Sequence, residues 1–364
     1  MTGTQAISRI DLASEARLSE TTQWRSYHVF YGGSPYVLLQ ECLLPLANRL
    51  VAEGTAVEYF FINYWLEGAH VRLRFRVNPD KRASLDRQVM AEAQRYLDEH
   101  PSLHPMKELL DSSLYTTLFD GEFTDAARPH YFADDGTPVF AENNTVQVRD
   151  YVPEWDRYGG EKGMLLSERC FVDSSKQVDE LMSLGNLRVR GILLGMSAQL
   201  TFITAACLLK EAPLIVDFFR VYHRRWLRTG LPPEYATEKG RKEIAPFAAQ
   251  LGAMITEYAE ALKKSDIDAL PHTLQNWARV CTSYINTVEH LYESNESLEF
   301  DFNEGHRAAA NPTEAAWALC HSFIHMTNNR MLVSVADEAF VAYLILMAMG
   351  DDALVTAGEG GNDE

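Results

Sequence analysis

The chain has 364 residues, of which 46% are hydrophobic and 23% charged, an ordinary globular composition that excludes disordered and collagen-like classes. At about 150 residues per domain, this length suits roughly two domains. The 33 Lys and Arg residues stand against 51 Asp and Glu, giving a formal net charge of -18. Such a charge disfavours direct binding of tRNA and of membrane surfaces.

The first part of the chain predicts a flexible arm and then the start of a sheet module. Residues 1–22 are polar, and we expect them to form the arm. The aromatic-rich segment 24–31 predicts a strand, and leucines at helical spacing predict a helix over 35–53. Residues 57–66 and 70–77, joined by Glu-Gly-Ala, predict a hairpin.

The rest of the sheet module follows the same logic. A polar helix is expected over 81–99, a stretch with little regular pattern over 100–142 and a further strand over 145–151. The order strand, helix, strand, strand, helix, strand is typical of ferredoxin-like antiparallel sheets. We therefore expect an α+β fold with a ferredoxin-like sheet module over 23–158, which contains the insertion.

After Tyr158 strand signals nearly vanish and helical spacing dominates, which predicts a mostly helical region over 159–350. The expected helices are 161–183, 187–210, 213–228, 238–264, 270–293, 312–330 and 335–349. The Gly- and acid-rich residues 351–364 predict a disordered tail.

One segment has the length of a membrane span, because 191–209 is uncharged. Serine, glutamine and threonine interrupt it, so a buried core helix is the better interpretation. The five cysteines are scattered without a CxxC motif, as expected of reduced, buried thiols, and the N-terminus carries no recognisable secretory signal. We expect a cytoplasmic protein without a membrane span.

The segment 70–77 (HVRLRFRV) has the most distinctive pattern. With a strand period of two, His70, Arg72, Arg74 and Arg76 share one face. Like charges along a strand repel, so the row requires negative charge, supplied by protein carboxylates or by an anionic ligand. The pattern suggests a carboxylate- or phosphate-binding site, with a solvated or internally paired arginine face as the alternative.

Two further segments carry candidate residues. Arg157 lies in a Pro- and Gly-Gly-containing connector, where it suits either a ligand cleft or an ion pair with Glu154 or Asp156. His321 and His325 lie four residues apart on one predicted helix, but no third metal ligand follows at suitable spacing. A neutral imidazole there suits a general base. No nucleotide-binding or hydrolase motif occurs, and we expect neither a metal nor an organic cofactor.

These same places resemble a known family, the C-terminal domain of lantibiotic dehydratases, which also occurs as free-standing thiopeptide-type bacteriocin biosynthesis proteins. The resemblance runs over about 24–349. The segments that carry it are WRSYHVFY at 24–31, YFFINYWLEGAHVRLRFRV at 59–77, NNTVQVRDYVPEWDRYGGEKGMLLSERCFVDSS at 143–175 and HSFIHMTNNR at 321–330.

The resemblance implies two chemistries on one fold. In the first, a separate glutamyl-tRNA-dependent subunit glutamylates Ser or Thr of a leader-bearing precursor peptide. This module then expels glutamate to leave dehydroalanine or dehydrobutyrine. In the second, a formal [4+2] cycloaddition joins two dehydroalanines into a pyridine and releases the leader peptide.

The resemblance also implies roles for individual residues. His325 matches the proton carrier of the elimination reaction, and three arginines match the glutamate and oxyanion binders. These arginines are Arg72, Arg74 and Arg157. Second choices for substrate binding are His70, Arg76 and Arg330.

Two departures bear on which chemistry applies. Asn63 stands where many relatives have another arginine, and the long segment 80–142 is similar to that of the stand-alone proteins, which include cycloaddition enzymes. Retention of Arg72, Arg74 and His325 favours elimination. A non-catalytic leader-binding subunit, with the arginine strand docking an acidic leader, is the other alternative. A strand edge or sheet groove beside the strand at 24–31 also suits binding of the leader peptide by strand addition. The aromatic-rich hairpin also suits a homodimer interface.

Overall fold

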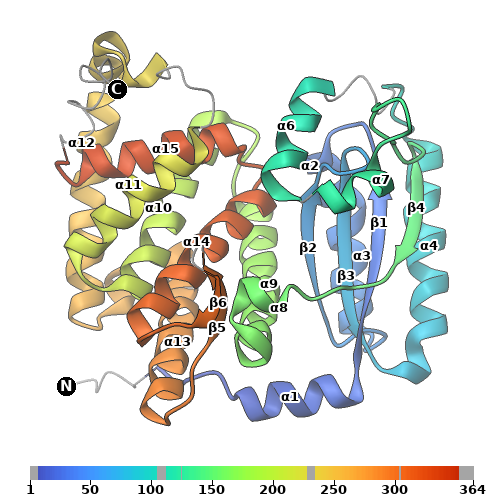
Figure 1. Ribbon diagram of the computed structural model, residues 1–364, viewed down its shortest axis with the longest axis horizontal. Helices are drawn as coiled ribbons and strands as arrows, with labels where there is room; N and C mark the ends of the chain where they lie inside the picture. Colours follow the sequence, from blue (N-terminus) through green and yellow to red (C-terminus); the bar gives the residue numbers. More distant parts are fainter. Residues whose placement is uncertain (1–6, 105–111, 124, 228–233, 303–304, 352–364) are drawn as a thin grey trace. The chain divides into compact units, whose positions relative to one another are not determined.

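The computed structural model describes residues 7–104, 112–123, 125–227, 234–302 and 305–351, and the chain divides into two compact units (Figure 1). The sheet unit comprises Ala13–Pro153. The helical unit comprises the residues from Glu154 onward together with those before Ala13. The expected α+β fold, an antiparallel sheet followed by a mostly helical half, is confirmed.

The sheet unit has four antiparallel strands in the order β2-β3-β1-β4. Their bounds are β1 Gln23–Phe30, β2 Glu58–Tyr64, β3 His70–Val77 and β4 Thr145–Arg149. This is the strand order of the ferredoxin-like fold, as the sequence predicts. Because β1 lies between β3 and β4, its edges are already paired, and strand addition is open only to β2 and β4.

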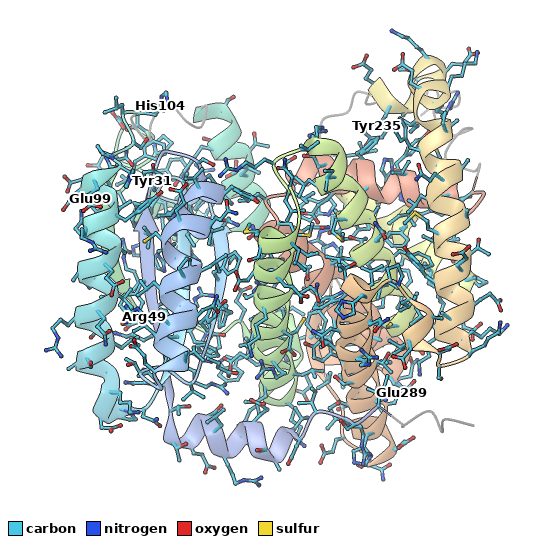
Figure 2. The ribbon with its side chains drawn as sticks, turned by 180° about the vertical axis from the view of Figure 1, so that it is seen from behind. Tyr31, Arg49, Glu99, His104, Tyr235 and Glu289 are labelled. Carbon is cyan, nitrogen blue, oxygen red and sulfur yellow. The ribbon has the colours of Figure 1, made fainter. Side chains whose placement is uncertain are left out.

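One face of this sheet is covered by two helical segments. The first runs as α2 Pro35–Leu38, a π-helical turn Leu39–Leu43 and α3 Leu44–Ala52, and the second is α4 Arg82–Glu99 after the 3₁₀ turn Pro79–Lys81. Tyr27 Oη donates to Asp86 of α4 at 2.6 Å, and Tyr59 Oη donates to Asn48 of α3 at 3.0 Å. Figure 2, seen from behind, shows the helices that carry Arg49 and Glu99 on this side of the strands.

The expected flexible arm is wrong for residues 12–21. Leu12–Thr21 forms helix α1, and two of its side chains, Glu15 and Ser19, contact Arg76 of β3. These residues lie four apart and therefore share one helical face. Because polar contacts with a buried arginine hold this helix, its sequence lacks the apolar stripe that would predict a helix.

The insertion 100–142 is also more regular than expected. It contains α6 Ser112–Glu122, the 3₁₀ turn Asp125–Ala127 and α7 Arg128–Tyr131. Tyr115 and Phe119, one helical turn apart, are fully buried with Phe132 and Leu66 in a small aromatic core. Aromatic packing between short elements, rather than local periodicity, orders this segment.

The helical unit contains each of the helices that the sequence predicts, with ends shifted by a few residues. Their bounds are α9 Gly160–Leu184, α10 Arg190–Leu209, α11 Ala212–Trp226, α12 Glu238–Lys263, α13 His272–Glu293, α14 Pro312–Arg330 and α15 Val335–Ala348, with 3₁₀ turns at Glu234–Ala236 and Ile267–Ala269. The connector before them also contains a short helix, α8 Trp155–Tyr158, which the sequence did not predict. A hairpin of β5 Glu299–Phe302 and β6 Gly305–Ala308 escaped prediction, because its strands are only four residues long.

The uncharged segment near residue 200 forms α10 at the centre of the helical unit. This helix is long and apolar enough to cross a membrane, but 67% of its most apolar window is buried. It packs against α11, α12, α13, α14 and α15. Burial on most sides accounts for its apolar composition, as expected for a core helix.

The connector after the sheet unit turns sharply at Gly159, which adopts a φ of 91°. A Cβ atom at this position would lie 2.9 Å from the Phe300 ring and 3.0 Å from Leu298 Cβ. Both the left-handed backbone and the lack of space therefore require glycine. The predicted tail begins at Asp351, and 352–364 lie outside the described residues.

Candidate active-site residues

The strand register places the basic residues of β3 on the sheet face opposite to α3 and α4. Arg72 pairs with His28 of β1, and Arg74 pairs with Ser26, which is also the partner of Arg149 on β4. Directly paired residues of antiparallel strands point to the same face. We call this surface, formed by Ser26, His28, His70, Arg72, Arg74 and Arg149, the arginine face.

Arg72 and His70 form one hydrogen-bonded unit on this face. Arg72 Nε donates to His70 Nε2 at 3.1 Å, and His70 Nδ1 lies 2.8 Å from the Gly68 carbonyl oxygen. His70 therefore donates through Nδ1 and accepts through Nε2, the neutral tautomer. The Arg72 guanidinium also lies 3.5 Å from the centre of the Tyr64 ring, a cation–π contact that orients it.

Arg74 lies among aromatic rings one step along the strand. Its guanidinium carbon is 4.9 Å from the Tyr151 ring centre and 5.3 Å from that of Phe60, and its Nε donates to Ser26 Oγ at 3.4 Å. A guanidinium is planar and presents its N–H groups as a fork, a geometry that suits bidentate binding of a carboxylate.

Two buried imidazoles report the electrostatic potential of the arginine face. The pKa of His28 is lowered to about 2, first by burial and then by the charges of Arg72, His70, Arg74 and Arg149. Burial and Arg72 likewise lower the pKa of His70 to about 3. Both histidines are neutral at pH 7, and the arginines around them create a positive potential that favours an anion.

Sequence reasoning did not single out His28. It is 7% exposed and stacks on His70 with ring centres 4.9 Å apart, and its Nδ1 has no hydrogen-bond partner among the described residues. The sequence feature that could have identified it is its position in the predicted strand 24–31, four residues after Trp24. Only the register of β1 against β3 reveals that it faces Arg72.

Arg76 differs from the other two arginines of the strand, and its second-choice role in substrate binding does not fit its surroundings. It is 2% exposed, and one Nη lies 3.1 Å from Glu15 Oε2 and 3.2 Å from Glu58 Oε1. Its guanidinium also stacks 4.8 Å from Trp24. Two carboxylates neutralise it in the interior, so Arg76 is a structural residue.

In the helical unit, His325 of α14 contacts a buried carboxylate. Its Nδ1 lies 2.8 Å from Oε1 of Glu338, which is 1% exposed at the start of α15. Tyr222 of α11 hydrogen bonds to the other oxygen, Oε2. The Trp226 ring stacks on the imidazole with centres 4.8 Å apart. Residues of α15 and α11 thus contact the edge and the face of this imidazole, respectively.

His321 lies one turn earlier on α14, where the charge of Arg157 acts on it. Its pKa is lowered to about 3, first by burial and then by the charges of Arg225, His325 and Arg157. Arg157 of α8 is half-exposed and its Nη1 donates to Glu154 Oε2 at 3.1 Å, the ion pair that the sequence offered as an alternative. We call Tyr222, Trp226, His321, His325 and Glu338 the His325 cluster.

Arg330, another second choice for substrate binding, lies in the interior of the helical unit. It is 1% exposed, and its Nε donates to Ser175 Oγ at 3.1 Å while Nη1 donates to the Met326 carbonyl at 2.8 Å. It also lies 5.3 Å from the Phe171 ring. These contacts join α14 to α9, so Arg330 has a structural position rather than one suited to a substrate.

Over residues 24–349 the chain matches the family model described as lantibiotic biosynthesis dehydratase C-term. The chain belongs to this family. The resemblance found in the sequence is thereby confirmed, and membership ties the protein to the enzymes that modify ribosomally made peptides. No curated protein matches the chain.

Two solved structures share the fold of this family member. The pyridine synthase TbtD from thiomuracin biosynthesis matches with a TM-score of 0.66 and 16% identity, over 91% of this chain and 98% of that chain. TsrL matches with a TM-score of 0.55 and 16% identity, over 92% and 98%. The tRNA-dependent lantibiotic dehydratase MibB from Microbispora sp. 107891 has a TM-score of 0.48 and 18% identity, over 92% of this chain and 28% of its own.

In this member of the dehydratase C-terminal family, Glu338 and Tyr222 are the residues that sequence reasoning missed beside His325. They lie 13 and 103 residues away from it in the chain, on separate helices. Within the described residues, no group of three His, Cys, Asp or Glu side chains is arranged to hold a metal ion. The chemistry that these residues offer is proton transfer and anion binding.

Proposed function

We propose that this chain removes glutamate from glutamylated Ser or Thr residues of a ribosomal precursor peptide, producing dehydroalanine or dehydrobutyrine. The observation that carries the proposal is the arginine face, where Arg72 and Arg74 stand side by side and two buried imidazoles remain neutral beside them. The glutamyl group carries one free carboxylate while it is esterified to the peptide, and a second carboxylate forms when glutamate leaves. A positively charged face favours both carboxylates.

The reaction needs a base, and we assign this role to His325. Its Nε2 accepts the Cα proton of the glutamylated residue, and the electron pair of the Cα–H bond forms the Cα=Cβ double bond. The Cβ–O bond breaks, and glutamate departs as a carboxylate with the electron pair of that bond. His325 then returns the proton to water. Because the leaving group is a weak base, it requires no acid to depart.

The arginines stabilise the two negative charges of this step. As the Cα proton leaves, charge develops on the adjacent amide oxygen, and we assign this oxygen to Arg157, whose charge, like that of Arg225, reaches the His325 cluster. We assign the leaving glutamate to Arg72 and Arg74. A partner subunit must supply the glutamylated peptide, since the net charge of -18 does not suit tRNA binding.

The missing arginine at position 63 does not weaken this assignment. Asn63 pairs with Val71, so it lies on the face that the helices cover rather than on the arginine face. Ile62 is the β2 residue opposite Arg72. An arginine in place of Asn63 would therefore add no charge to the proposed glutamate site.

Incubation of the purified chain with a glutamylated precursor peptide, followed by mass spectrometry, tests the proposal. We expect each glutamylated residue to lose glutamate and become a dehydro residue. Two other results would overturn it. Conversion only of the fully dehydrated peptide, with leader release, would assign a [4+2] cycloaddition. Leader-dependent binding without conversion of either peptide would assign a non-catalytic subunit.

A further inference from the structure

A buried carboxylate beside His325 has no part in the proposed reaction as written above. Glu338 lies in the first two turns of α15, and its side chain is completely removed from solvent. Burying a carboxylate costs several kcal/mol unless hydrogen bonds or charges compensate for the lost water. The residues that compensate for the burial of this carboxylate therefore indicate its role.

The hydrogen bonds of Glu338 have a defined direction. Burial and the neighbouring carboxylate raise the pKa of Tyr222 well above its ordinary value, so the phenol keeps its proton and donates it to Oε2. Oε1 is then the acceptor that faces His325 Nδ1 at 2.8 Å. A carboxylate has no proton to give, so the hydrogen of this contact belongs to the imidazole.

We infer that Glu338, itself held by Tyr222, is a positioning residue that keeps His325 in the tautomer protonated on Nδ1. Nε2 then carries the lone pair that abstracts the Cα proton. After proton transfer the same carboxylate stabilises the imidazolium. The stacked Trp226 ring fixes the plane of the imidazole, so that both nitrogens point in set directions. The kinetic part of this inference rests on the proposed function.

The start of α15 has an N-cap and an acidic residue besides Glu338. Ser334 caps the helix by accepting from the Asp337 backbone N–H at 3.2 Å, and its Oγ also lies 2.9 Å from Asp337 Oδ2. Asp337 in turn forms an ion pair with Arg190 at 2.5 Å. Ser334 and Asp337 thus provide a cap and a negative charge at this helix start. The carboxylate of Glu338 instead points at α11 and α14.

The substitution Glu338→Gln tests the inference. An amide presents an oxygen to one neighbour and an N–H to the other, so it cannot accept from Tyr222 and His325 at once. We expect kcat for glutamate elimination to fall about 100-fold or more, with KM for the glutamylated peptide little changed. Glu338→Asp keeps a carboxylate and should recover part of the rate.

Asp337→Asn is the matched control, because it removes the neighbouring carboxylate from the same helix start. We expect it to keep most of the activity. A second readout is independent of turnover: NMR of protein labelled with ¹⁵N-histidine, with the His325 signals identified by their loss in His325→Ala. Wild type should show Nδ1 protonated and Nε2 unprotonated, and Glu338→Gln should shift this tautomer balance.

The outcomes separate this inference from the proposed function. If Glu338→Gln keeps both the wild-type kcat and the wild-type tautomer, the positioning role is wrong. If Asp337→Asn loses as much activity as Glu338→Gln, the effect is one of helix stability and the inference also falls. If wild type eliminates no glutamate while the tautomer still depends on Glu338, the proposed function fails and the positioning of His325 stands.

Discussion

The histidines of the arginine face make the sheet unit sensitive to acid in a way that can be measured. Protonation of His28 and His70 in the folded protein is opposed by burial and by the arginines, and their pKa values are about 2 and about 3. In the unfolded chain an imidazole titrates near its ordinary value of 6.5. Below that pH the unfolded state binds more protons, so the free energy of unfolding falls as the pH falls.

The magnitude follows from the size of this pKa difference. Between pH 7 and pH 5 each histidine lowers the free energy of unfolding by about 2 kcal/mol, and the two together by about 4 kcal/mol. The loss continues as the solution becomes more acidic and levels off only near pH 3 for His70 and near pH 2 for His28. The substitution His28→Phe keeps the stacked ring and removes one titrating group, so it should remove about half of the loss.

Hydrogen exchange followed by mass spectrometry, on peptides from β1 and β3 at several pH values, measures this local stability. When the pH is lowered from 7 to 5, we expect wild type to lose about 2 kcal/mol more of its local stability than His28→Phe. His130→Phe, at an exposed position of the same unit, is the control and should follow wild type. If His28→Phe loses protection as steeply as wild type, the positive potential of the arginine face has been misjudged.

Two further predictions distinguish arginines of the same strand. Arg76→Met leaves the carboxylates of Glu15 and Glu58 without their cation in the interior, and chemical denaturation should show a loss of about 3–5 kcal/mol. The half-exposed Arg49→Met is the comparison and should lose under about 1 kcal/mol. Equal effects would contradict the buried ion pair. Arg72→Met should instead preserve stability and precursor binding while glutamylated peptide accumulates in the elimination assay; a uniform loss of precursor affinity would favour the leader-binding alternative.

The sequence predicted the sheet well because its signals are local. The period of two in HVRLRFRV placed Arg72, Arg74 and Arg76 on one face, and the register confirms this. It could not separate Arg76 from the others, because the carboxylates that neutralise Arg76 come from α1 and β2. The helix α1 itself escaped prediction, since its stabilising contact is with a strand more than fifty residues later.

For a similar reason, the sequence predicted the histidines of the His325 cluster but not Glu338 or Tyr222. The spacing of His321 and His325 predicted a shared helix face, and α14 confirms it. Glu338 is one of many acidic residues near helix starts, and Tyr222 one of sixteen tyrosines. Only tertiary packing of α11, α14 and α15 brings the phenol, the carboxylate and the imidazole together.

The most direct test of the central claim follows the Cα hydrogen of the glutamylated residue. A precursor peptide glutamylated at a serine that carries deuterium on Cα is incubated with wild type and with His325→Ala, and the products are weighed by mass spectrometry. We predict that wild type releases glutamate together with the deuterium, whereas His325→Ala retains both. Glutamate and deuterium that stay on the peptide with wild-type protein would contradict the assignment of this chain as a glutamate-eliminating enzyme.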